Sequence, residues 1–359
     1  MSDEAEPDPE RLKHYARHVF GAMGGAMTAA MICLGDRLGL YRALAGSGPV
    51  TSRELAQRTG LHERWLREWL YQQGAAGVLE HRGGERFALS AEGRAVLADE
   101  SHPAFGAGFF SHLPETLSVL DRLTESFRTG IGLPYDAFGP GGAVGVERGF
   151  APWFKNFLVP LALPALGDVV PRLAAGAKVA DVGCGAGVAL IEMARAYPRS
   201  EFHGYEISQH ALARARESAA RAGLANVAFH DAAREPLPAG ADFALVTSFD
   251  CLHDMTDPAG ALRAIRRALA ADGTWLAADI KARASYAENA EKNPMAAMMY
   301  GTSLLTCMSS ALSEPGGAGL GTLGLPAEKL ERMAREAGFR EFHELDLGHP
   351  VNAFYVGRP

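Results

Sequence analysis

The spacing of apolar residues divides the chain into a helical first part and an alternating second part. From His14 to Leu34 apolar side chains recur with the period of a helix, and Met23, Met27 and Met31 lie four residues apart on one face. Met packs well into irregular cores and interfaces, so we expect this stripe to be buried. Core packing is the first interpretation, and a pocket wall or a dimer contact is the second.

The next stretch, residues 38–93, predicts three helices and a hairpin. Thr51 with Glu54 forms a capping box that opens the second helix, and Gly60 ends it. The third helix has an apolar face that includes Trp65 and Leu66, which we expect to be buried. Two short strands around Gly83-Gly84 then complete the outline of a winged helix.

From about Pro160 strands and helices alternate, which predicts a mostly parallel sheet with helices on both faces. The last strand follows its neighbour without room for a crossover helix, so we expect it to be antiparallel. The predicted strands are 177–183, 201–208, 226–232, 243–249, 273–280, 340–347 and 352–359.

These patterns predict a domain order. Residues 1–13 form a tail, and 14–100 a winged-helix domain that serves dimerisation. The Gly- and Pro-rich residues 101–150 form a connector, and 151–359 the α/β domain, with an insertion over 282–325.

Composition narrows the class of protein. The 359 residues carry a net charge of −7, which disfavours nucleic-acid binding. The four cysteines lie far apart, so neither a disulfide framework nor a metal site is predicted. The acidic start lacks an apolar signal core, which predicts a cytoplasmic protein. Uncharged stretches at 19–35 and 293–313 contain Gly, Ser or Thr, and we interpret both as buried helices rather than membrane spans.

A glycine-rich loop follows the first strand of the alternating part, in the sequence VADVGCGAGVAL. No Gly-Lys-Ser/Thr follows, which excludes a triphosphate loop, and Val188 stands where a dinucleotide loop has Gly or Ala. Asp181 would repel a pyrophosphate but suits a cationic ligand. Glu206 ends the second strand, where carboxylates meet ribose hydroxyls, and Asp231 ends the third, near an adenine. S-Adenosylmethionine combines an amino group, a ribose and an adenine without phosphate.

With this loop, residues 160–359 resemble the class I S-adenosylmethionine-dependent methyltransferases. The resemblance implies a seven-stranded sheet with a reversed last strand. It also implies that the loop surrounds the methionine end of the cofactor, while Glu206 holds the ribose and Asp231 the adenine edge. Over residues 20–359 the chain resembles small-molecule methyltransferases with an N-terminal winged-helix dimerisation domain. The candidate cofactor-binding residues are Asp181, Gly183, Cys184, Gly185, Glu206, Ile207, Asp231, Ala232, Ser248 and Phe249.

The acceptor side is predicted just after the fourth strand, at SFDCLHDMTDP. Methyl transfer to a hydroxyl needs a group that removes a proton, and His suits this because its pKa lies near working pH. His253 and Asp254 match a His-Asp pair of related O-methyltransferases, although Met255 stands where that family often has Trp. Helix capping by His253 is the alternative. Asp250 or Asp257 could orient the imidazole, and Asp257 could instead cap the next helix.

The insertion is rich in Met and Leu, as expected of a lid over an apolar acceptor, although a core helix fits equally well. Its candidate substrate-binding residues are Met298, Tyr300 and Asn293. The leading hypothesis is therefore transfer of a methyl group to a hydroxyl of an aromatic or polyketide-like small molecule by a homodimer. The alternatives are N-, C- or S-methylation, non-methylating use of the cofactor, and a DNA-binding regulator that binds the same cofactor.

Overall fold

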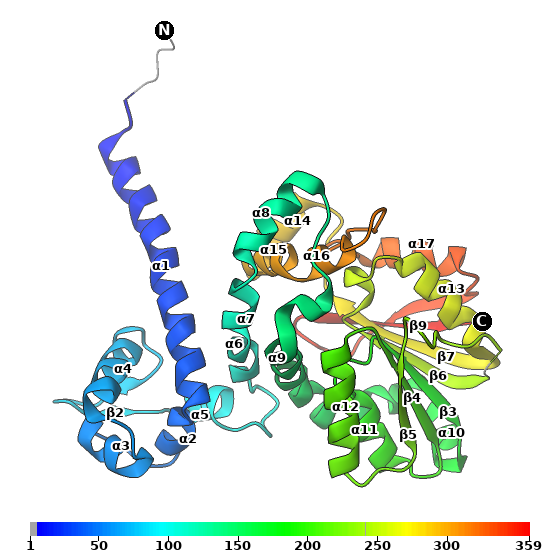
Figure 1. The fold of residues 1–359 in the computed structure, drawn as a ribbon, viewed down its shortest axis with the longest axis horizontal. Coiled ribbons are helices and arrows are strands. Elements are labelled where there is room, and N and C mark those ends of the chain that lie inside the picture. The colour runs from blue at the N-terminus through cyan, green and yellow to red at the C-terminus, as the bar shows by residue number, and fades with distance from the viewer. Residues whose placement is uncertain (1–5, 241) are drawn as a thin grey trace. The chain divides into compact units, whose positions relative to one another are not determined.

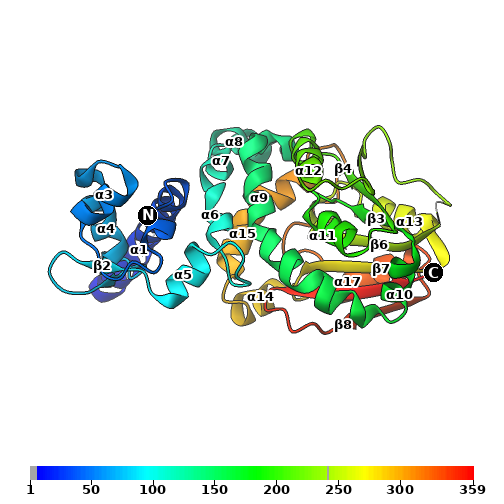
Figure 2. The same cartoon turned by 90° about the horizontal axis from the view of Figure 1, so that it is seen from below.

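The computed structural model describes residues 6–240 and 242–359, which form two compact units that divide between Pro114 and Glu115. Of the predicted tail 1–13, residues 1–5 lie outside the described residues, and the first helix already begins at Pro9. The boundary between the units falls inside the short helix α7 (Leu113–Leu117). Figures 1 and 2 show the two units as ribbons.

The first unit is a long helix followed by a winged helix (Figure 1). The helix boundaries and the hairpin that the sequence predicted for this unit are both present. Thr51 and Glu54 form the predicted capping box, and Gly60 ends the helix in a left-handed conformation. The two hairpin strands pair antiparallel. The elements are α1 (Pro9–Arg37), α2 (Leu40–Leu44), α3 (Ser52–Thr59), α4 (Glu63–Ala75), β1 (Glu80–His81), β2 (Phe87–Ala88), α5 (Ala91–Leu97) and α6 (Ala107–Ser111).

Two expectations for this unit are wrong. Leu66 is buried as expected, but Trp65 is 80% exposed because it lies on the outer side of α4. The first part of helix α1 is not buried within the chain either: Met23 and Met27 are 61% and 51% exposed, and of the three methionines only Met31 packs against the core of the unit, beside the buried Ile32. Among the described residues, α1 alone is a single helix long and apolar enough to cross a membrane.

The second unit contains a seven-stranded sheet of order β5-β4-β3-β6-β7-β9-β8. Strands β3 to β7 are parallel to one another, while β9 runs antiparallel to both β7 and β8. This confirms the predicted sheet and its reversed last strand. The strands are β3 (Lys178–Val182), β4 (Glu201–Glu206), β5 (Val227–Asp231), β6 (Phe243–Phe249), β7 (Leu269–Ile280), β8 (Glu341–Leu345) and β9 (Asn352–Arg358).

Helices cover both faces of this sheet (Figures 1 and 2). Neighbouring strand residues point to opposite faces, so Val179 and Leu245 pack with one helical layer while Ala180 and Val246 pack with the other. The first layer includes η3 (Pro164–Leu166), α10 (Val169–Ala175), α11 (Val188–Ala196) and α12 (Gln209–Arg221). The second is formed by α13 (Pro258–Ala268) and α17 (Ala327–Glu336).

The stretch expected to be a connector is largely helical. It contains α8 (Leu120–Thr129), the 3-10 helix η1 (Tyr135–Phe138) and α9 (Gly139–Trp153), which runs into the π-helix η2 (Phe154–Ala162). Gly142, Gly145 and Gly149 lie buried in α9, where their small size allows close packing. The insertion holds α14 (Tyr286–Lys292), α15 (Ala296–Leu305) and α16 (Cys307–Ala311). The Gly132 N–H, in the segment after α8, donates a hydrogen bond to the carbonyl of Leu312, the residue that follows α16.

Candidate active site

The glycine loop between β3 and α11 needs glycine for backbone and steric reasons. Gly183, Gly185 and Gly187 all have positive φ, at 70°, 52° and 75°. A Cβ at Gly183 would lie 2.6 Å from the Cβ of Cys251, and one at Gly187 would lie 2.5 Å from the ring of Phe229. At Gly185 nothing lies within 4 Å of such a Cβ. The backbone at Gly185 is therefore open to the approach of a ligand.

Glu206 ends β4 directly beside this loop. One carboxylate oxygen accepts a hydrogen bond from the Gly185 N–H at 2.8 Å, and the other accepts from the N–H groups of Ile207 and Ser208. Burial raises the pKa of Glu206, while these backbone donors oppose the shift. The predicted ribose-binding carboxylate thus lies where the loop approaches the end of β4.

Asp231 ends β5 and is the register partner of Glu206. Its carboxylate accepts a hydrogen bond from the Gln209 amide at 3.0 Å, and the N–H of Ala232 donates to the Glu206 carbonyl. Glu206 and Asp231 therefore meet at the carboxyl edge of the sheet, as parallel strands require.

Asp181 lies under the loop and is almost fully buried. Its carboxylate accepts a 2.7 Å hydrogen bond from the Thr247 hydroxyl of the adjacent strand β6. Burial raises the pKa of Asp181 to about 7, and the Thr247 bond only partly opposes this. A buried carboxyl whose hydrogen-bond partner is the neutral Thr247 hydroxyl favours a cationic ligand, so the residues present fit the methionine end of S-adenosylmethionine.

The structure does not bring every side chain named from the sequence into the site. The Ser248 hydroxyl is turned into the core, where it accepts a hydrogen bond from the Trp275 indole N–H at 3.0 Å. The thiol of Cys184 is packed in the core as well. These two residues can contribute only main-chain groups. Ile207 is exposed beside Glu206, while the ring of Phe249 lies 5.3 Å from Phe154 and 6.0 Å from Trp153.

A segment that the sequence did not single out reaches the same edge. The Asp136 carboxylate, in η1, accepts hydrogen bonds from the Ser208 hydroxyl and, at 3.0 Å, from the Gln209 N–H. Its neighbour Tyr135 is enclosed, and burial raises the pKa of that phenol well above its usual value. The Gly- and Pro-rich pattern around these residues gave no sign of this, because no local signal links Asp136 to the start of α12.

His253 is held by a carboxylate other than the expected ones. It lies in the 3-10 helix η4 (Leu252–Asp254), and its Nδ1 is 2.7 Å from Oδ1 of Asp279 at the end of β7. The side chains are 3% and 1% exposed. Asp257 instead caps α13 by accepting from the Gly260 N–H. The Asp250 carboxylate accepts from the Asn352 amide at 2.5 Å, and burial raises the pKa of Asp250 to about 8.

The charge state of His253 reflects opposing effects. Burial lowers its pKa, but the Asp279 carboxylate and hydrogen bonds with Asp279 and the Cys307 thiol outweigh burial and raise the pKa well above its usual value. For Cys307 burial raises the pKa, and the bond with His253 and the imidazolium charge lower it overall. Asp254 lies on the same short helix, and burial raises its pKa.

The insertion meets this site through Cys307 and not through the residues named from the sequence. Met298 is largely exposed. The Asn293 amide is used within the insertion, where its oxygen accepts from the Met295 N–H. Tyr300 packs against Tyr286 with ring centres 5.9 Å apart. In these positions the three side chains are occupied locally or face outward.

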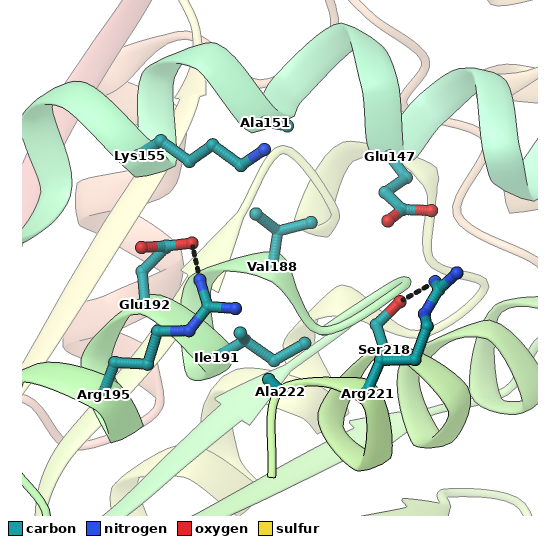
Figure 3. A pocket seen from close by; sticks show the side chains of 10 residues that line it. All are labelled: Glu147, Ala151, Lys155, Val188, Ile191, Glu192, Arg195, Ser218, Arg221 and Ala222. Carbon is teal, nitrogen blue, oxygen red and sulfur yellow. Dashed lines mark hydrogen bonds and ion pairs between the residues drawn. The ribbon is translucent and has the colours of Figure 1, made fainter. Parts of the chain in front are cut away.

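A separate groove of about 240 Å³ lies on the outer helical layer (Figure 3). Charged side chains from α9, η2, α11 and α12 face it, and some are already paired: Arg195 with Glu192 at 3.0 Å, and Arg221 with the Ser218 hydroxyl at 3.2 Å. None of its ten lining residues is among the predicted site residues. The groove is therefore distinct from the carboxyl edge of the sheet.

Comparison with known proteins agrees with this architecture. Residues 173–338 match the model of a methyltransferase domain, and residues 26–98 match that of an Rv2258c-like winged helix-turn-helix domain. A mitomycin biosynthesis 6-O-methyltransferase of Streptomyces lavendulae is 34% identical over 107 residues, which is 30% of each chain. The chain thus aligns with less than a third of the length of that curated relative.

Solved structures extend the similarity to the whole chain. The mitomycin 7-O-methyltransferase MmcR has a TM-score of 0.65 at 22% identity, with 98% of this chain and 100% of that one covered. Human N-acetylserotonin methyltransferase, solved with S-adenosylmethionine, has a TM-score of 0.65 at 17% identity, with 100% and 99% covered. At these identities the similarity shows the fold.

The matched domains and the carboxyl-edge site show that the chain carries a methyltransferase domain with the class I S-adenosylmethionine-dependent fold, preceded by an Rv2258c-like winged helix-turn-helix domain.

Proposed function

We propose that the protein transfers the methyl group of S-adenosylmethionine to a hydroxyl of an aromatic or polyketide-like small molecule. The observation that carries the proposal is the buried His253–Asp279 pair, which follows β6 at the edge where the glycine loop and Glu206 lie. Partial similarity to a mitomycin 6-O-methyltransferase and to a tetracenomycin 8-O-methyltransferase, 36% identical over 95 residues, supports this acceptor class.

In this proposal each residue has a distinct task. The cofactor, when bound, supplies an electrophilic methyl group on a sulfonium. The Asp181 and Glu206 carboxylates bind and orient the cofactor. The Nδ1–H of His253 donates to Asp279, so Nε2 accepts the proton of the acceptor hydroxyl when that hydroxyl takes the place of the Cys307 thiol beside the ring. The buried surroundings of His253 exclude water from this proton transfer.

The direct experiment is methyl labelling. The protein is incubated with cofactor labelled in its methyl group and with extracts of the native cell, and the labelled product is identified. An O-methylated small molecule is expected. A product labelled on nitrogen, carbon or sulfur would replace the hydroxyl assignment, and release of no S-adenosylhomocysteine with any acceptor would contradict methyl transfer.

Glu206→Ala should weaken binding of S-adenosylmethionine and S-adenosylhomocysteine alike. The variant removes a charged acceptor from the ribose position and leaves the Gly185 N–H without its partner, so we expect a loss of roughly 1.5–3 kcal/mol in calorimetry. Glu217→Ala, on the exposed side of α12, is the matched control and should bind normally. Tight NAD binding without a response to S-adenosylmethionine would contradict the cofactor assignment.

Binding of the cofactor should depend on pH through Asp181. The pKa of this carboxyl is about 7, and a cationic ligand favours its ionised form. Below pH 7 binding must displace a proton, so affinity should fall as pH decreases from about 8 to 6, by up to tenfold per unit. Calorimetry in two buffers of different ionisation enthalpy measures the proton released. Asp181→Asn should remove this release, and proton release by the wild type that Asp181→Asn leaves unchanged would refute the assignment.

We infer that the protein is a cytoplasmic homodimer formed through residues 14–100. From Pro9 to Met27 every residue of α1 except the half-buried Ala16 is exposed, and the large exposed side chains include Tyr15, Val19, Phe20, Met23 and Met27. Such a helix needs a covering surface, and a second copy of this chain offers an identical one.

Light scattering tests the assembly on the intact chain and on a variant with Phe20, Met23 and Met27 all replaced by Ser. A dimer is expected for the first and a monomer for the second. A monomeric intact chain, or co-sedimentation of α1 with phospholipid vesicles instead of self-association, would contradict this inference.

The ion pairs on the winged helix favour a role in dimerisation over a role in DNA binding. Two arginines of α4 are already paired within the helix, Arg64 with Glu68 at 2.5 Å and Arg67 with Glu63 at 2.8 Å. Phosphate contacts would have to compete with these carboxylates. A filter-binding assay with random duplex DNA at low salt distinguishes a dimerisation domain from a DNA-binding one. Retention of the duplex on the filter would favour the DNA-binding regulator.

A further inference from the structure

Three potential metal ligands from distant parts of the chain converge beside the proposed base. A ring nitrogen of His253, a carboxylate oxygen of Asp254 and Sγ of Cys307 all lie within 4.8 Å of one another. His253 and Asp254 belong to η4, whereas Cys307 begins α16 in the insertion. No metal-ligand spacing is visible in the sequence, because the two segments are far apart along the chain.

The hydrogen bond between His253 and Asp279 resembles the one that a zinc-binding histidine makes through its other ring nitrogen. Metal-binding histidines typically donate their other ring N–H to a carboxylate, which fixes the ring and its tautomer. Asp279 accepts in this way from Nδ1, so Nε2 is the nitrogen available to a ligand. The Thr306 hydroxyl lies 3.5 Å from Sγ of Cys307 and can orient the thiolate.

The ligand set and the local charge select the class of ion. One nitrogen, one sulfur and one carboxylate oxygen suit zinc-class ions, whereas magnesium prefers oxygen alone. Tetrahedral zinc holds such donors roughly 3.3–3.7 Å apart, so contraction by about 1 Å completes the site. Asp250 lies close to His253 and Asp279, so three carboxyl-bearing residues, Asp250, Asp254 and Asp279, surround the cluster, and a bound cation would favour their ionised forms.

We propose that His253, Asp254 and Cys307 form a binding site for a zinc-class divalent ion with an open fourth position. Asp254 and Cys307 are only partly buried, so an ion can reach them. Bound there, the ion occupies the same imidazole lone pair that the acceptor proton needs. Zinc and proton abstraction by His253 therefore exclude each other, a consequence that rests on the proposed function, whereas ion binding itself does not.

Cobalt is the probe, because thiolate ligation gives an intense near-ultraviolet charge-transfer absorption. Chelator-treated full-length protein is titrated with Co²⁺, and zinc affinity is measured by competition. The wild type should show the charge-transfer band and strong visible absorption of a four-coordinate ion. Cys307→Ser should lose the band and bind zinc at least 10–100-fold more weakly. The matched control Cys33→Ser, a buried cysteine of the first unit, should behave as wild type.

Two further variants make the site specific. Asp254→Asn should keep the charge-transfer band and weaken zinc binding at least tenfold. Asp279→Asn should weaken zinc binding by roughly 10–100-fold, because the imidazole loses the carboxylate that orients it. Melting temperatures of all variants check folding. A wild type without the band, a band that persists in Cys307→Ser, or unchanged zinc affinity in Asp254→Asn would overturn the site. Zinc inhibition of methyl transfer tests the consequence separately, and loss of transfer activity altogether would not affect the spectroscopic result.

Discussion

His253→Gln should lower methyl transfer by about 10²–10⁴-fold while leaving cofactor affinity nearly unchanged. Gln keeps much of the bulk and a hydrogen-bonding tip, but it cannot accept a proton at working pH. His253 is 3% exposed and is aligned by Asp279, so no solvent base replaces it readily. The measurement is single-turnover methyl transfer on the identified acceptor, with chelator present.

The size of the loss should depend on the acceptor. Acceptors of lower pKa ionise without help, so the ratio of wild-type to variant rates should shrink along a series of increasingly acidic hydroxyls. His343→Gln, on the exposed surface of β8, is the matched control and should be as active as wild type. Full turnover by His253→Gln, with methyl transfer limiting the rate, would show that alignment of an already nucleophilic acceptor suffices.

Asp279→Asn should lower the maximal rate by roughly 10–100-fold, a part of the full effect of the base. It should also change the pH profile. The Asp279 carboxylate is the main group that raises the pKa of His253, with Cys307 acting in the same direction from α16 and the carboxyls of Asp250 and Asp254 nearby. Only neutral imidazole accepts a proton, so the wild-type rate should rise with pH through the raised pKa.

Removal of the Asp279 charge takes away the partner of the imidazolium. The pKa of His253 then falls, and the rise in rate should move to lower pH even as the maximal rate decreases. Asp257→Asn is the matched control, because Asn caps a helix as well as Asp, and the charge partner it would lose is Arg263, 3.7 Å away at the exposed surface of α13. A merely structural role for Asp279 would lower activity without moving the profile, and that result would refute the assignment.

The loop and the carboxylates proposed to bind the cofactor could be predicted to lie together because their signals are local. The loop from Asp181 to Gly187 is contiguous, and Glu206 and Asp231 were found as the ends of consecutive strands. The order of the sheet then places those ends side by side. The fold follows the same logic, since periodicity alone distinguishes its strands from its helices.

The proposed acceptor side of the site could not be predicted in the same way, because it depends on contacts between segments that are far apart in the sequence. Asp279 lies 26 residues beyond His253 and meets it only because β7 pairs with β6. Asp254 is the nearer carboxylate in sequence, yet the carboxylate at hydrogen-bond distance from the imidazole is that of Asp279. Residues 139–153 had the composition of a loop, yet tertiary packing of their small residues stabilises α9.

Two main-chain hydrogen bonds tie the insertion to the loop that carries His253. The Gly321 N–H donates to the His253 carbonyl at 3.0 Å, and the Ala318 N–H donates to the Thr256 carbonyl at 2.9 Å. An exchange of the insertion with that of another methyltransferase would therefore also replace the donors that hold the base loop. Engineering of acceptor scope should move residues 250–257 and 307–322 as a single cassette, since neither part keeps its backbone partners alone.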